Sequence, residues 1–209
     1  MFGAPDYWFV DFGSATPTED PTAAWNHGGI QPEIGQIWLG IVGPGVRRTN
    51  DKEPDAEIEF SDHTDVRPTV LALTGLQDDY THDGRVLFEV LDSSAVPESL
   101  HDHSQTLFRL GRLYKQINAP FGKLGLTSLK VSTFALASSS TNDTAYTKLE
   151  AKIAAWRSQR DSLAGRIRTI LDSALERINE EQAEDLIEQT QALLDQVSDC
   201  ATDLPECAL

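Results

Sequence analysis

The segment 149–178 reads LEAKIAAWRSQRDSLAGRIRTILDSALERI, and apolar residues recur along it at intervals of three and four. They are Leu149, Ile153, Trp156, Leu163, Ile167, Ile170, Ala174 and Ile178. This spacing indicates one apolar stripe on a long amphipathic helix. Asn179 interrupts the pattern, and a second stripe follows, made by Leu186, Ile187, Leu193, Leu194 and Val197. The simplest arrangement of two such helices is an antiparallel hairpin, so the sequence predicts a helical hairpin over 146–199, followed by a tail over 200–209.

The charged residues of this hairpin are expected to form solvated faces, and the alternative is that they bind a partner. Leu107, Leu110, Tyr114 and Ile117 also recur at helical spacing, which predicts a further helix over 102–118. A serine- and threonine-rich stretch at 138–142 is typical of a linker. We therefore expect residues 1–137 to form a unit of their own, to which the hairpin is appended.

Composition limits the functions that this chain can perform. It has 209 residues and a formal net charge of −16, which disfavours binding to nucleic-acid backbones and to anionic membranes. A small phosphate-bearing substrate is compatible with this charge if a metal ion reverses the local field. No apolar run approaches the roughly 18–20 residues of a membrane-spanning helix, and no signal peptide is visible.

The two cysteines, Cys200 and Cys207, both lie close to the carboxyl end of the sequence. They could close a small disulfide loop in an oxidising compartment, or they could be two free thiols. Their spacing matches no zinc-knuckle pattern. The sequence leaves the choice between disulfide and thiols open.

The first half of the chain predicts part of an α/β unit. An apolar run at 37–43 has the character of a buried strand and leads into a Gly-Pro turn. After a polar loop, Thr64 or Asp65 can cap a helix that carries Pro68 in its first turn, where proline is tolerated, and that stops at Gly75. A strand, a turn and a helix in this order make half of a βα unit.

Among the five histidines, His27 is the candidate metal ligand. Gly28 and Gly29 follow it, and small neighbours allow the backbone to pass close to a bound ion, while neutral imidazole is a good zinc ligand. The alternative is a loop histidine with its ring in solvent. His63 is expected to bond to loop carbonyls, and the alternative is that it joins a metal site. His82 is expected in a turn, and His101 and His103 on the surface.

Five short motifs follow one another in the first part of the chain: PDYWF at 5–9, NHGG at 26–29, VGPG at 42–45, HTDVRPTVL at 63–71 and DGRVL at 83–87. This ordered set resembles the C-terminal part of the catalytic domain in the alkaline phosphatase superfamily. The bacterial members related to type I phosphodiesterase/nucleotide pyrophosphatases are the most similar. The resemblance implies an α/β sandwich over 1–137 and a hydrolase of phosphate monoesters or diesters.

The resemblance also implies a site with two metal ions, usually zinc, at which a serine or threonine nucleophile forms a phospho-enzyme. His27 matches the last metal ligand of that family in chain order. The family's nucleophile and its other ligands would lie before His27, where this chain has no counterpart, so no catalytic residue is assigned. We therefore expect a C-terminal fragment that is inactive alone, with a small phosphoester as the substrate of the complete enzyme.

Members of the family are often exported, which favours a secreted or cell-envelope location. An exposed sheet edge would favour self-association. A sulfatase or a phosphoglycerate mutase of the same superfamily is a second enzymatic possibility, and the alternative function is that of a non-catalytic interaction or scaffold protein derived from this fold.

Overall fold

The computed structural model describes residues 39–48, 61–77, 79–138 and 143–208. The chain divides into two compact units, Met1–Val42 and Gly43–Leu209, and every described helix belongs to the second. Four long helices contain more than half of the described residues of that unit: α4 (Ser104–Asn118), α5 (Lys123–Ala137), α6 (Thr144–Asp172) and α7 (Glu180–Thr202).

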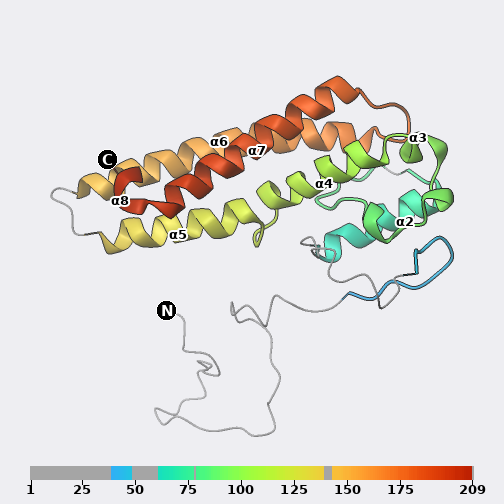
Figure 1. Cartoon of the computed structure of the whole chain (residues 1–209), viewed down its shortest axis with the longest axis horizontal. Coiled ribbons are helices and arrows are strands. Elements are labelled where there is room, and N and C mark those ends of the chain that lie inside the picture. Colours follow the sequence, from blue (N-terminus) through green and yellow to red (C-terminus); the bar gives the residue numbers. More distant parts are fainter. Residues whose placement is uncertain (1–38, 49–60, 78, 139–142, 209) are drawn as a thin grey trace, which may run out of the picture. The chain divides into compact units, whose positions relative to one another are not determined.

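These four helices form a bundle around one apolar core. In Figure 1, α4 and α5 follow one another along the α6–α7 hairpin, and all four helices contact one another. The most deeply buried members of the core include Leu110, Tyr114, Val131, Leu149, Ile167, Leu186 and Leu193. The hairpin predicted over 146–199 therefore shares its core with α4 and α5.

Local residue chemistry sets where the bundle helices begin and end. Asn179 is the N-cap of α7, and its side-chain oxygen accepts a hydrogen bond from the backbone N–H of Gln182 at 3.1 Å. Pro120 separates α4 from α5. At Gly122, an added Cβ would lie 2.5 Å from the carbonyl oxygen of Lys115. Only glycine therefore fits at this close approach between the connection and the end of α4.

A second region precedes the bundle and contains shorter elements. They are η1 (His63–Asp65), α2 (Val66–Thr74), η2 (Phe88–Val90), η3 (Ser93–Ala95) and α3 (Glu98–His101). Gly75 ends α2 in the left-handed conformation at φ 63°, as the sequence predicts. Leu100 and Leu107 join Ala72 and Ala174 in a small second apolar cluster.

The predicted fold class, an α/β sandwich over 1–137, is wrong. The described residues form helices and a single isolated bridge between Val46 and Leu91, and they contain no strand. Residues 39–43 of the predicted strand have irregular backbone, and Val42 is 99% exposed. Gly40, Gly43 and Pro44 explain the error, because glycine and proline disfavour a regular strand even within an apolar run.

The helices predicted from apolar periodicity are confirmed. The helix expected over 102–118 is α4, the helix expected to end at Gly75 is α2, and the two apolar stripes correspond to α6 and α7. The first apolar stripe was predicted to continue to Ile178, but α6 ends at Asp172. Ala174 and Ile178 lie after the helix and still pack into the second apolar cluster. Helix α5 was not predicted.

Candidate interaction surface

Helix α5 carries apolar side chains on two opposite faces. Leu124, Val131 and Ala135 are buried in the bundle. On the other side, Leu126, Leu129 and Leu136 are exposed by 51%, 61% and 73%. We call these three residues the leucine stripe. Their spacing of three and seven places them on one helix face, in the a and d pattern by which helices pair.

A groove of about 1060 Å³ lies beside the leucine stripe, between α4, the start of α5 and α7. Ile187 and Leu194, exposed by only 5% and 2%, line it together with the partly buried Leu113. Leu126 and Phe121, which is 50% exposed, also line the groove. The stripe and the groove thus form one continuous apolar surface.

Charge is segregated across this surface. Residues 104–137, which include α4 and α5, contain five Lys or Arg residues and no Asp or Glu. Residues 180–209, which include α7, contain nine Asp or Glu residues and no Lys or Arg. One side of the groove is therefore basic and the other side is acidic.

Part of this charge is used within the molecule. Nη1 of Arg109 on α4 donates to both carboxylate oxygens of Glu184 on α7, at 2.8 and 2.9 Å. Other charged side chains along the groove point into solvent: Lys123 at the start of α5, and Glu188 and Asp195 on α7 are all exposed. The two sides can accordingly attract opposite charges on a molecule that docks here.

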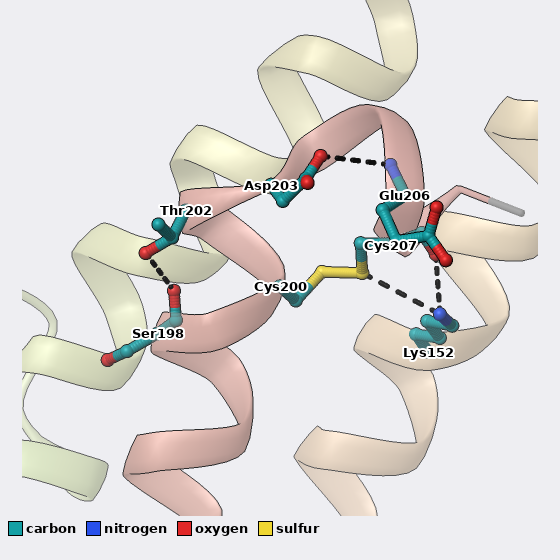
Figure 2. The surroundings of a disulfide bond; sticks show 7 residues. All are labelled: Lys152, Ser198, Cys200, Thr202, Asp203, Glu206 and Cys207. Atoms are coloured by element: carbon teal, nitrogen blue, oxygen red, sulfur yellow. Dashed lines mark hydrogen bonds between the residues drawn. A yellow bond between two sulfur atoms is a disulfide. The ribbon is translucent and has the colours of Figure 1, made fainter.

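The far end of the bundle is closed by a disulfide between Cys200 and Cys207. Figure 2 shows this bond joining α7 to the short helix α8 (Leu204–Cys207). Nζ of Lys152 on α6 donates to the carbonyl oxygen of Cys207 and lies 3.6 Å from its Sγ, so α8 contacts both helices of the hairpin. The sequence left disulfide and free thiols open, and the structure has the disulfide.

A buried polar cluster lies between the short elements and α4. Asp65 is fully buried; its carboxylate accepts hydrogen bonds from the backbone N–H of Arg85 at 2.8 Å and of Asp62 at 3.0 Å. Nζ of the buried Lys115 lies 3.2 Å from Asp65 and 2.8 Å from Asp62, and donates to Thr64 Oγ1 at 2.9 Å. Burial acts to raise the pKa of Asp62, but the bonds from Lys115 and Thr64 outweigh it and hold that pKa below its ordinary value.

We assign this cluster a structural role, because both carboxylates already accept hydrogen bonds from donors of the same chain. The sequence predicted Thr64 or Asp65 as the cap of the helix that carries Pro68. Asp65 is the N-cap residue of α2 but makes no side-chain cap bond to it; its carboxylate instead accepts from the N–H groups of Asp62, in the capping box of η1, and of Arg85. Asp62 caps η1 by accepting from Thr64 N–H at 2.9 Å. Lys115 was missed, since its partners lie about fifty positions away in sequence.

The predicted metal ligand, His27, lies outside the described residues. Of the remaining histidines, His63 is exposed at the start of η1, and the ring of His82 meets that of Tyr80 edge-on at 5.6 Å. His101 is exposed, whereas His103 is partly buried; Nδ1 of His103 lies 2.8 Å from Glu180 and links the starts of α4 and α7. Within the described part of the chain, no group of three or more His, Cys, Asp or Glu side chains could hold a metal ion.

No protein-family profile, curated protein or solved structure matches this chain. Among the described helices, none combines the length and the apolar character needed to cross a membrane.

Proposed function

We propose that this chain is an interaction protein, a disulfide-closed helical bundle that pairs with a second copy of itself through the leucine stripe and the adjoining groove. The observation that carries the proposal is the segregation of charge on the two sides of this apolar surface. A surface that pairs with its own copy must be complementary to itself, and this surface presents both signs of charge on opposite sides of an apolar centre.

The charges also define how the two copies would be arranged. A two-fold axis that runs along the groove places the basic side of one copy against the acidic side of the other. Lys123 of each copy then faces Glu188 or Asp195 of its mate. An axis across the groove would instead bring like charges together, which is unfavourable.

The apolar part supplies the attraction, and the charges supply the orientation. Full burial of a leucine side chain is worth roughly 1.5–3 kcal/mol, and the three stripe residues still expose 51% to 73% of their surface. Because association costs at least about 4 kcal/mol in lost freedom, we expect a dimer of moderate strength, with a dissociation constant of about 1–100 μM.

The phosphoesterase hypothesis is not carried forward. It rested on a resemblance that implied an α/β sandwich, and the described residues of 1–137 are helical where that fold would have its sheet and helices in alternation. The disulfide supports function in an oxidising compartment, such as the cell exterior or envelope, because such bonds persist there.

Sedimentation equilibrium tests the proposal. The wild-type chain, at ~0.15 M salt so that the general repulsion of its net charge is screened, should shift from monomer to dimer as its concentration rises through the micromolar range. Leu129→Lys should weaken the dimer at least tenfold, because it places a charge in the centre of the stripe.

The matched control is Val70→Lys, which makes a similar change at a 52% exposed apolar residue on α2, away from the groove. It should leave the association unchanged. A wild-type chain that stays monomeric throughout this range would contradict the proposal, as would equal effects of the two substitutions.

A further inference from the structure

The second apolar cluster surrounds a pocket of about 210 Å³. Side chains from α2, from the segment 79–88, from α3 and α4, and from the end of α6 line it. Ala72, Leu100, Leu107 and Ala174, each exposed by 5% or less, belong both to this lining and to the buried cluster. The pocket therefore reaches into the protein interior and is separate from the groove beside α5.

The pocket is also open to solvent. Leu76 and Tyr80 belong to its lining but are exposed by 59% and 61%. At the inner end, Leu107 is exposed by only 2%. A ligand can thus enter beside Leu76 and Tyr80 and bury itself against Leu107 without any opening of the bundle.

The mouth has aromatic and acidic character. The guanidinium of Arg67 lies 4.6 Å above the Tyr80 ring, and the His82 ring meets Tyr80 edge-on. These contacts hold an aromatic wall at the entrance. Two carboxylates, Asp79 and Asp172, also line the pocket and are exposed, and they outnumber the single guanidinium of Arg67 at the mouth. Their negative charge disfavours an anion at the mouth.

Size and chemistry together define the class of ligand. A dry cavity of about 150 Å³ lined by apolar side chains is known to bind a single benzene ring. The present pocket is somewhat larger and mostly apolar, and its exposed polar side chains lie near its opening. The buried Arg85 also lines it, but the guanidinium of Arg85 is paired with the carboxylate of Glu89. Such a site accommodates one ring with a small polar substituent that stays near the mouth.

We propose that this pocket is a binding site for a small, uncharged, single-ring apolar molecule of the phenol type. The ring occupies the space between Leu100, Leu107 and Ala174, and its hydroxyl faces the mouth beside Thr81 and His82. The site works independently of pairing through the leucine stripe, because the two surfaces share no lining residue.

Titration with p-cresol and with benzoate, followed by calorimetry and by amide chemical shifts, tests this proposal on the full chain. We expect p-cresol to bind with a dissociation constant at or below about 1 mM and benzoate at least tenfold more weakly. The shifts should centre on α2 and on segment 79–88. Absence of p-cresol binding at that level, or equal binding of the two probes, would overturn the proposal.

Substitutions that fill the pocket locate the site. Ala72→Leu adds bulk from α2 and should weaken p-cresol binding at least tenfold, while Val70→Leu on the exposed side of the same helix should leave it unchanged. If Ala72→Leu does not fold, as judged by circular dichroism, Leu175→Phe fills the pocket from the end of α6 and decides the question in the same way. Undiminished binding to a folded filling variant would show that p-cresol binds elsewhere and would overturn the assignment.

Discussion

The bundle and the segment before it are stabilised by different kinds of contact. The bundle, α4 to α7, is joined by interdigitated aliphatic and aromatic side chains such as Tyr114 and Leu186, both fully buried. Besides the second apolar cluster, the segment 61–101 is tied to the bundle through buried polar groups, above all Asp65, Arg85 and Lys115. We call it the polar-anchored segment. The difference shows why regular helices can be predicted from the sequence, while the docking of an irregular segment cannot.

The two kinds of contact also differ in how they fail. An apolar core loses free energy in proportion to the volume removed, and its cost spreads over the whole cooperative unit. A buried charge is tolerated only while its partners are present, so loss of a single partner leaves an uncompensated group. Substitution of one or two of these polar residues should therefore open the polar-anchored segment without unfolding the bundle.

The largest expected effect comes from the bundle. Leu186→Ala, at a fully buried position on α7, should lower the free energy of unfolding by about 3–4 kcal/mol through lost burial and a residual cavity. Urea unfolding followed by circular dichroism measures it, with the exposed Gln191→Ala on the same helix as control. A loss no greater than that of the control would refute the assignment of α7 to the core.

Asp65→Asn should cost about 3 kcal/mol, because it removes one of the two carboxylates beside the buried Lys115. Hydrogen exchange should show the loss in the polar-anchored segment and leave α6 and α7 protected. Asp92→Asn removes an exposed carboxylate that caps η3 at 3.0 Å and is the matched control; asparagine can also cap a helix, so its effect should be much smaller than that of Asp65→Asn. Equal loss of protection in the polar-anchored segment and in the bundle would contradict the view that the two regions open separately.

Reduction of the Cys200–Cys207 bond should destabilise the end of the bundle by at most about 2.5 kcal/mol, the chain-entropy value for a loop with a sequence separation of 7. The double variant Cys200→Ser/Cys207→Ser reports the same loss without reductant. Thermal unfolding of the oxidised chain, the reduced chain and the double variant measures it. An oxidised chain no more stable than the other two would mean that the bond does not stabilise the bundle.

The smallest expected effects come from one substitution made in each region. Gly75→Ala places a side chain at φ 63°, where Cβ meets only Pro97 at 3.7 Å, so its cost is the left-handed backbone penalty of about 1 kcal/mol. Gly165→Ala in α6 meets nothing within 4 Å and should instead stabilise by about 1 kcal/mol through helix propensity. Chemical denaturation of both variants checks the opposite signs, and effects of the same sign would contradict the backbone assignment.

Helical periodicity predicted α4, α6 and α7 because each buries one face and leaves the other polar. Helix α5 was not predicted because it departs from this pattern: Leu124 and Val131 face the core while Leu126 and Leu129 face solvent, so no single apolar stripe is visible. The exposed leucines that hid this helix are the ones that form the candidate interaction surface.

Other features required information that no local pattern contains. The partnership of Lys115 with Asp65 joins positions far apart in the chain, and neither residue type predicts burial. The apolar run at 37–43 suggested a strand, but residues 39–43 are irregular. By contrast, the absence of acidic residues from 104–137 and of basic residues from 180–209 is visible in the sequence, and it could have directed attention to the groove.

The most direct test of the central claim, that the groove is complementary to itself, is a mixing experiment by sedimentation equilibrium. Lys123→Glu places an acidic residue on the basic side, and the double variant Glu188→Lys/Asp195→Lys places two basic residues on the acidic side. The account predicts that each variant alone associates at least tenfold more weakly than the wild type, whereas their equimolar mixture forms a heterodimer. Two variants that self-associate like the wild type, or a mixture that stays monomeric where the wild type is dimeric, would contradict it.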